Sequence, residues 1–272
     1  MKPKPLKVGN VTIGGGKPAF ILGPYVIESE KSLRRTARRI AEICRAESLP
    51  FVLKASYDKA NRTSVRSYRG IGTREGCKLL SAIGRELKVP VTTDVHSPAD
   101  AEIAGKEIDI LQIPAFLCRQ TDLLRAAAQT GRVINVKKGQ FLAPWDVRNI
   151  AEKLVAFGNT KFFFTERGTT FGYNNLVADM RSLHWMRANG YLIVFDATHS
   201  VQQPGGAGDS TSGDSALAPV LARAALAAGC DGIFMEVHES PARALSDGPN
   251  QIPLKQLPKH LRVLKAIHAA VS

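Results

Sequence analysis

The residues from Pro50 to Ser64 (PFVLKASYDKANRTS) hold the densest group of chemically active side chains in the sequence. The apolar run Phe51–Leu53 predicts a short buried strand. Directly after it the sequence supplies cations, an amide and hydroxyls: Lys54, Ser56, Lys59, Asn61, Arg62, Thr63 and Ser64. Such groups at the end of a strand bind phosphate and sugar hydroxyls. A solvated basic loop is the ordinary explanation for one such cluster, so a phosphosugar site needs support elsewhere in the chain.

Polar and charged side chains also follow the other predicted strands. In chain order these are Asp94 and His96, Gln112, Lys137 and Lys138, Glu166 and Arg167, Asp196 and His199, and Glu236 and His238. If the predicted strands form a closed parallel barrel, their carboxyl ends meet on one face, where barrel enzymes place their catalytic residues. We therefore expect four cations around one small volume: Lys54, Lys59, Lys137 and Arg167. Like charges gather there only if an anion compensates them, and a phosphate with a carboxylate would do so.

The elements that would position these residues alternate between strands and helices. Apolar runs of strand character occupy Ala19–Leu22, Phe51–Leu53, Pro90–Thr93, Ile110–Ile113, Val133–Val136, Phe162–Thr165, Leu192–Phe195 and Gly232–Met235. Amphipathic stretches between most of them predict helices, among them Thr121–Gln129, Pro144–Phe157, Ser215–Ala228 and Leu257–Val271. Eight such units predict an α/β fold, a closed (β/α)8 TIM barrel. A doubly wound open sheet is the second choice, but no GxGxxG motif follows a strand.

The chain reads as one domain over residues 1–272, because no linker or shift in composition interrupts it. Residues 7–18 precede the first barrel strand and look like an N-terminal β-hairpin. The segment 202–215 (QQPGGAGDSTSGDS) is rich in glycine and serine, which predicts a mobile loop after the seventh strand.

Composition places the chain among soluble intracellular proteins. With 44% hydrophobic residues it can bury a sizeable core, yet no apolar run approaches the length of a membrane span. The N-terminal MKPKPLKVGN lacks the apolar segment of a signal peptide. The four cysteines are widely spaced without a CxxC pair, which favours reduced thiols over a disulfide framework. We expect a cytoplasmic protein with no membrane partner.

The net charge of +13 raises the question of nucleic-acid binding. Only 7% of residues are aromatic, and no tail concentrates the charge. The densest basic run, Lys31 to Arg45, has apolar residues at helical spacing and predicts an amphipathic helix with a solvated basic face. We expect small phosphorylated substrates rather than nucleic acid. They account for part of the charge, and the rest serves solubility.

The motifs also resemble a known family. They are KASYDKANRTS, SYRG, TTDVH, LQIPAFLCRQTDLL, INVKKGQF, TERGTTFGYNNLVADMRS, FDATHSVQ and FMEVHESP. Nearly the whole chain resembles 3-deoxy-D-manno-octulosonate 8-phosphate synthases, TIM-barrel enzymes of lipopolysaccharide sugar biosynthesis that condense phosphoenolpyruvate with D-arabinose 5-phosphate. The related heptulosonate 7-phosphate synthases typically carry KPRTS where this chain has KANRTS, so that activity ranks second. A non-catalytic phosphosugar-binding barrel is the alternative from another class.

The resemblance implies roles for particular residues. Those expected to hold phosphoenolpyruvate are Lys54, Lys59, Gln112, Lys137 and Arg167. Those expected at arabinose 5-phosphate are Asn61, Arg62, Thr63 and His96, with Arg62 reaching across a subunit boundary. The expected catalytic residues are Lys59, Asp94 and His199. The resemblance further implies a homotetramer and a loop, 202–215, that covers the site.

The metal site is where the sequence departs from this resemblance. One branch of the family binds a divalent metal through Cys, His, Glu and Asp, and the other has Asn in place of the Cys. His199, Glu236 and Asp247 match three of the ligands, but Tyr25 stands at the fourth position. A phenol with a pKa near 10 is a poor substitute for a thiolate. We therefore expect that no tightly bound metal cofactor is required, while a weak divalent site is compatible with the other three residues.

Overall fold

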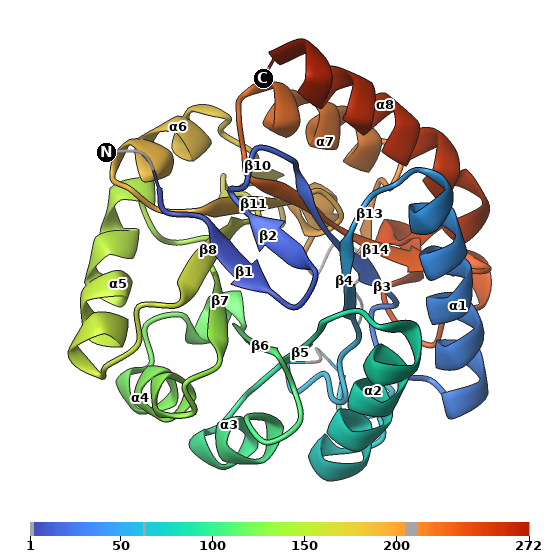
Figure 1. The fold of residues 1–272 in the computed structure, drawn as a ribbon, viewed down its shortest axis with the longest axis horizontal. Coiled ribbons are helices and arrows are strands. Elements are labelled where there is room, and N and C mark those ends of the chain that lie inside the picture. Colours follow the sequence, from blue (N-terminus) through green and yellow to red (C-terminus); the bar gives the residue numbers. More distant parts are fainter. Residues whose placement is uncertain (1–2, 62–63, 205–211, 272) are drawn as a thin grey trace.

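The computed structural model describes residues 3–61, 64–204 and 212–271 and contains a closed parallel barrel (Figure 1). The barrel strands in the described residues are β3 (Ala19–Gly23), β4 (Phe51–Lys54), β5 (Val91–Asp94), β6 (Ile110–Ile113), β7 (Val133–Lys137), β8 (Phe162–Glu166), β11 (Ile193–Asp196) and β14 (Gly232–His238). Consecutive strands pair in parallel, and β14 pairs with both β11 and β3, which closes the ring. The predicted TIM barrel is confirmed.

Helices cover the outside of this ring, as Figure 1 shows. They are α1 (Glu30–Ala46), α2 (Thr73–Leu87), α3 (Pro98–Ala104), α4 (Thr121–Gln129), α5 (Val147–Ala156), α6 (Arg181–Ala188), α7 (Ala218–Ala227) and α8 (Leu257–Val271). In α1 the basic run forms the predicted amphipathic helix: Leu33, Ala37 and Ile40 are buried. Its N-terminus is capped by Ser29, whose side chain accepts the N–H of Ser32 at 3.2 Å. No helix among the described residues combines the length and hydropathy of a membrane span.

Shorter elements decorate the loops. The remaining strands are β1 (Leu6–Val8), β2 (Val11–Ile13), β9 (Thr169–Thr170), β10 (Leu176–Val177), β12 (Gln202–Gln203), β13 (Ser212–Gly213) and β15 (Ile252–Pro253). Short 3-10 helices include η3 (His199–Val201), directly after β11, and η5 (Gly248–Asn250). The loop predicted at 202–215 lies partly outside the described residues. Within its described parts, the short strands β12 and β13 pair with each other in antiparallel orientation.

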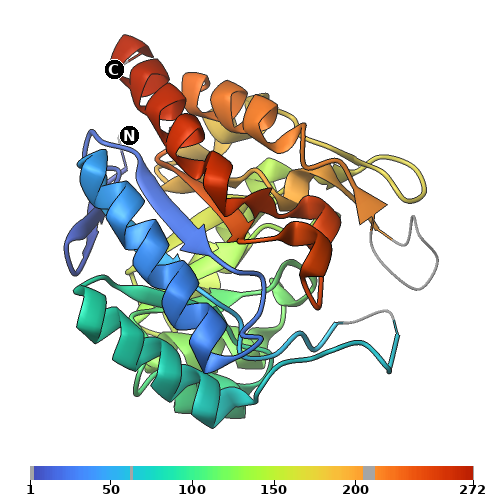
Figure 2. The same cartoon turned by 90° about the vertical axis from the view of Figure 1, so that its right-hand side faces the viewer.

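The hairpin β1–β2 lies across the end of the barrel at which the strands begin (Figure 1), which confirms the predicted N-terminal hairpin. Figure 2 shows it at the opposite end from residues 64–72, which lie between β4 and α2. Val8, Val11 and Ile13 pack with inward-facing barrel residues such as Phe163 and Phe234 in one buried cluster. This apolar contact closes the bottom of the barrel and leaves the C-terminal strand ends for polar side chains.

Candidate functional site

A cavity of about 530 Å³ opens at the C-terminal ends of the barrel strands. Its polar and aromatic lining includes Tyr25, Lys59, Asn61, Asp94, His96, Gln112, Lys137, Gln140, Arg167, His199, Gln202 and Glu236. The expected convergence of strand-end residues is therefore confirmed for most of them. The expected ligands Arg62 and Thr63 lie outside the described residues.

The close approach of β3 and β4 depends on Gly23. A Cβ atom at this position would lie 1.8 Å from the carbonyl oxygen of Lys54, so only glycine fits. The next residues after β3 then run beside β4, and Val26 forms a parallel bridge with Ser56. This packing brings Tyr25 next to the cations supplied by β4 and the loop that follows it.

Asp94 holds Lys59 at the cavity wall. The Lys59 ammonium lies 3.1 Å from Asp94 Oδ2, and the Ser56 hydroxyl donates to the same oxygen at 2.8 Å. Burial alone would raise the pKa of Asp94, but the nearby ammonium groups of Lys59 and Lys54 hold it well below its ordinary value. Burial likewise disfavours the charged Lys59, yet the carboxylates around it raise its pKa. Both groups are therefore charged at neutral pH.

A row of polar side chains supports Asp94 from the neighbouring strands. Gln112 donates to Asp94 Oδ1, Asn135 donates to Gln112 at 2.9 Å, and Thr165 donates to Asn135 at 2.7 Å. The parallel register places Asp94, Gln112 and Asn135 side by side. Asn135 is not among the site residues predicted from the sequence, although an amide within the apolar run VINV is a signal for a buried hydrogen-bond network.

Asp196 lies at the end of β11 and serves two functional side chains with one oxygen. Its Oδ2 forms an ion pair with the Lys137 ammonium and lies 2.6 Å from His199 Nδ1. The pKa of Asp196 lies well below its ordinary value, because His199 and Lys137 outweigh the effect of burial. In a neutral imidazole this contact places the proton on Nδ1 and directs the lone pair of Nε2 into the site.

Arg167 presents an incompletely satisfied guanidinium to the cavity. One terminal nitrogen donates to the His199 carbonyl at 2.9 Å and to Gln202 Oε1 at 2.6 Å, whereas the buried Nε has no hydrogen-bond partner among the described residues. Burial lowers the pKa of Arg167 against the opposing effect of nearby carboxylates. A buried cation with an unused N–H group fits an anionic ligand.

The backbone around Arg167 is fixed from below by Glu166 and Lys138, two strand-end residues that do not line the cavity. Glu166 accepts the backbone N–H groups of Arg167 and Gly168 at 2.9 and 2.8 Å. The fully buried Lys138 ammonium lies 3.5 Å from the Glu166 carboxylate. This pair therefore holds Arg167 in place rather than contacting a ligand.

Lys54 also lies beneath the cavity and does not contribute to its lining. Its side chain is only 1% exposed and forms an ion pair with Glu236, and it donates to the Tyr25 carbonyl at 2.9 Å. Lys54 thus neutralises Glu236 from below. The other expected cations, Lys59, Lys137 and Arg167, face the cavity.

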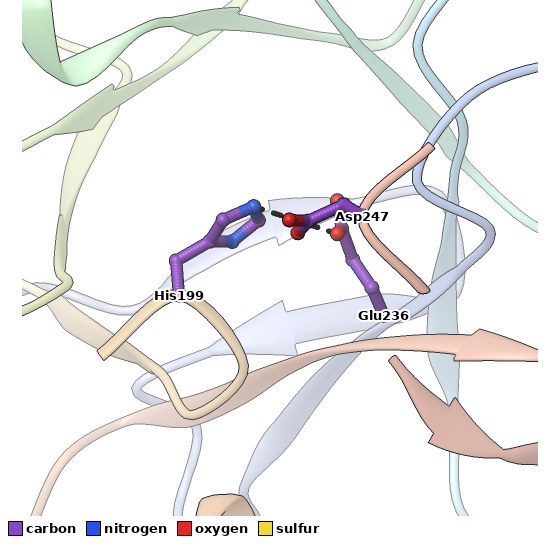
Figure 3. A group of neighbouring side chains, drawn as sticks. All are labelled: His199, Glu236 and Asp247. Carbon is purple, nitrogen blue, oxygen red and sulfur yellow. Dashed lines mark ion pairs between the residues drawn. The ribbon is translucent and has the colours of Figure 1, made fainter. Parts of the chain in front are cut away.

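The three expected metal ligands do come together, as Figure 3 shows. Their donor atoms all lie within 4.8 Å of one another, with His199 after β11, Glu236 on β14 and Asp247 on the loop before η5. Glu236 Oε2 is buried without a hydrogen-bond partner among the described residues and faces His199 Nε2 at 3.4 Å. Two lone-pair donors that face each other in this way fit a divalent cation between them.

Tyr25 occupies the position at which the family resemblance predicts a fourth ligand. It lines the cavity, and its ring centroid lies 6.0 Å from that of His199. All four cysteines are free and buried, and the cavity lining contains none of them. Burial raises the pKa of Cys44, Cys77 and Cys230 to about 12, so these thiols are poor metal ligands.

A TIM barrel whose strand ends gather buried cations around one cavity belongs to the class of barrel proteins that bind small anionic molecules. The DAHP synthetase I family matches residues 3–272, and the chain belongs to this family. It is 59% identical over 265 residues to the 2-dehydro-3-deoxyphosphooctonate aldolase of Pelobacter propionicus, with 97% of each chain covered. The protein of the same name from Geotalea daltonii is 55% identical over 269 residues, which cover 98% of this chain and 99% of the relative. The resemblance read from the motifs is confirmed.

Proposed function

We propose that the chain condenses phosphoenolpyruvate with D-arabinose 5-phosphate and water to give 3-deoxy-D-manno-octulosonate 8-phosphate and phosphate. The observation that carries this proposal is the trio of buried cations that line one cavity, Lys59, Lys137 and Arg167. A molecule with both a phosphate and a carboxylate matches that charge. The relatives named 2-dehydro-3-deoxyphosphooctonate aldolase support this choice of reaction.

The proposed chemistry needs no covalent enzyme intermediate. Carbon 3 of phosphoenolpyruvate attacks the aldehyde carbon of the sugar, water adds at carbon 2, and the resulting hemiketal phosphate loses phosphate by cleavage of the carbon–oxygen bond. Lys137 and Arg167 orient phosphoenolpyruvate and stabilise the charge on the leaving phosphate. Lys59, which Asp94 holds in place, follows β4 and neutralises the same anion from another part of the cavity wall than Lys137 and Arg167, which stand at the ends of β7 and β8.

Proton transfer to and from the reacting water is assigned to His199. Asp196 fixes its Nδ1 at 2.6 Å, so Nε2 is the nitrogen that exchanges a proton on the cavity side. A divalent ion, when held by His199, Glu236 and Asp247, would add Lewis-acid polarisation of the aldehyde or the water. We propose that turnover does not require it.

The sugar phosphate is assigned to the side of the cavity formed by Asn61 and His96. Both residues line the cavity, and His96 Nδ1 is buried without a hydrogen-bond partner among the described residues. An unused polar atom beside an open volume suits a sugar hydroxyl. The assignment of Arg62 and Thr63 to the sugar phosphate remains a prediction.

We also propose a homotetramer that works in the cytoplasm in lipopolysaccharide sugar biosynthesis. Self-association is supported by exposed aromatic side chains on loops at the C-terminal face: Phe141, Trp145, Phe171 and Tyr173 are 51–100% exposed. Their loops are adjacent, since the N–H of Thr170 donates to the carbonyl of Gln140 at 3.0 Å.

The experiment that tests the reaction is phosphate release from phosphoenolpyruvate with each of two aldoses. Because KANRTS stands in place of KPRTS, we expect arabinose 5-phosphate to be preferred over erythrose 4-phosphate by at least about tenfold in kcat/KM, which is about 1.4 kcal/mol. Equal or reversed preference would favour the heptulosonate reaction. Binding of phosphoenolpyruvate without phosphate release from either aldose would instead indicate a non-catalytic barrel.

A further inference from the structure

Tyr25 is fixed in the site by its backbone on both sides. Its N–H donates to Gln251 Oε1 at 3.2 Å, and its carbonyl accepts the Lys54 ammonium at 2.9 Å. The residue is 8% exposed, and that exposure is to the cavity it lines. The Tyr25 backbone is therefore held beside the cavity by two groups that do not themselves belong to the lining, Lys54 and Gln251.

The ring face of Tyr25 is occupied by a cation. The Lys59 ammonium lies 3.8 Å from the ring centroid, and the Lys54 ammonium lies 5.5 Å from it. A cation over an aromatic face is attracted by the ring quadrupole, more strongly in a buried site than at a surface. Lys59 is thus held between two partners, the Asp94 carboxylate at 3.1 Å and the Tyr25 ring.

We propose that Tyr25 is a positioning residue for the binding of phosphoenolpyruvate. The Tyr25 ring holds the Lys59 ammonium in the place where this ammonium contacts the substrate anion. Neither Cys nor Asn, the residues expected at this position, can make this contact, because neither has an aromatic face. Lysine has a long flexible side chain, and a second fixed partner lowers the entropy lost when the ammonium meets a ligand. This inference rests on the proposed function.

The competing explanation is that the ring only fills space between β3 and the cavity. A space-filling ring could be replaced by an aliphatic side chain without a change in ligand affinity. The contact with a cavity-lining cation predicts the opposite, since an aliphatic side chain has no quadrupole. The two explanations therefore differ in phosphoenolpyruvate affinity rather than in stability.

The test compares Tyr25→Phe, Tyr25→Leu and a protein with pentafluorophenylalanine at position 25, which keeps the ring shape but reverses its quadrupole. Dissociation constants for phosphoenolpyruvate come from calorimetry on chelated full-length protein, together with kcat and KM for both substrates. All three proteins lack the hydroxyl, so Tyr25→Phe is the reference: we expect Leu and the fluorinated ring to bind phosphoenolpyruvate about five- to tenfold more weakly than Phe does. The KM for arabinose 5-phosphate should change less than twofold.

Tyr191→Leu is the matched control, because Tyr191 packs on Phe162 and Phe164 away from the cavity. It should leave the phosphoenolpyruvate affinity unchanged. If Tyr25→Leu does not fold, the phosphoenolpyruvate affinity of the protein with the fluorinated ring tests the proposal by the same criterion.

Wild-type affinity in both ring-altered proteins, or an equal loss in Phe and Leu, would overturn the role of the ring while leaving the reaction intact. Wild-type protein that neither binds phosphoenolpyruvate nor releases phosphate would overturn the proposed function and this inference together.

Discussion

Two of the cations that line the cavity, Lys59 and Lys137, are paired with a carboxylate, whereas Arg167 donates to a carbonyl and an amide oxygen, so positive charge remains for an anion to compensate. Asp196 is shared between Lys137 and His199, and Arg167 keeps a buried N–H group without a partner among the described residues. Burial lowers the pKa of both Lys137 and Arg167 relative to their ordinary values. A bound anion would relieve that penalty, so these two side chains should contribute most to substrate affinity and turnover.

Replacing either cation should therefore damage catalysis. We expect Lys137→Ala and Arg167→Ala each to lower kcat/KM. The corresponding loss of transition-state stabilisation should be about 2–4 kcal/mol, as for removal of a charged contact to a buried anion. Steady-state kinetics on folded variants measures this. Arg181→Ala is the control, because the Arg181 side chain is 76% exposed, pairs with Asp179 and does not line the cavity. Either cavity variant retaining kcat/KM within about threefold of wild type would show that the anion binds elsewhere.

We also expect the residue at position 25 to govern the metal requirement. We expect wild-type activity to survive exhaustive chelation, because a phenol replaces the thiolate that would complete a strong site. Metal content and activity measured before and after chelation test this. Tyr25→Cys should retain more bound metal than wild type after the same dialysis, since His199, Glu236 and Asp247 remain in place. Complete loss of wild-type activity on chelation, restored by a divalent ion, would contradict the prediction.

At the scale of elements, the ion pair between Lys138 and Glu166 joins the ends of β7 and β8. Lys138 also donates to the carbonyl oxygens of Gly139 and Leu142 at 3.2 and 3.0 Å, so it fixes the loop after β7 as well. Both side chains are almost completely buried. Removing one partner of such a pair leaves an uncompensated charge in the interior.

We expect Lys138→Met to lower the free energy of unfolding by about 3–5 kcal/mol, in the range found when one member of a buried pair is removed. Urea denaturation followed by circular dichroism measures it. Lys153→Met is the control, because Lys153 binds the Arg119 carbonyl and Thr121 at an exposed position and should change stability by less than about 1 kcal/mol. Equal stability of the two variants would mean that the pair is neutral.

Much of the element pattern could be predicted from the sequence. The barrel strands are almost completely buried and mainly apolar, and their predicted bounds differ from the observed ones by at most one residue at each end in most cases. β14 is the exception, since it continues to His238 although the apolar run was expected to end at Met235. Its last residues form a strand because β15 pairs with Val237 and His238, a contact between segments that no local pattern reveals.

Most residues of the site could be predicted from the sequence, but the arrangement of their side chains could be predicted less well. That strand-end cations meet follows from barrel topology alone. Whether Lys54 faces the ligand or lies beneath it depends on the buried position of Glu236. The alignment of Asp94 with Gln112 depends on strand register, which a run of apolar residues does not specify.

At the scale of the whole molecule, burial of histidine predicts how stability depends on pH. Burial lowers the pKa of His96 below its ordinary value of 6.5, so below that pH the unfolded chain binds a proton more readily than the folded one. The free energy of unfolding is therefore not reduced by His96 above pH 6.5, and it decreases as the pH falls through and below this value. The lowered pKa values of Asp94 and Asp196 add a second loss below about pH 4.

We expect the free energy of unfolding, measured in urea, to fall between pH 7.5 and pH 5.5. His96→Gln should reduce that slope, because the substituted side chain does not titrate. His260→Gln serves for comparison: burial also lowers the pKa of His260, so it should remove a separate part of the slope. A His96→Gln protein with the wild-type slope would assign the acid sensitivity to other groups.

The hairpin that closes the bottom of the barrel has a consequence for the order of events during synthesis. Val8, Val11 and Ile13 leave the ribosome before the barrel strands, but the surfaces that bury them include Leu192, Val194 and Phe234. The complete burial of these hairpin residues therefore waits until nearly the last barrel strand has been made. Contacts of such long sequence separation form late and slowly. Until β14 has been translated, the nascent chain carries an open ring with an exposed apolar interior, and chaperone contact during that interval would protect it from aggregation.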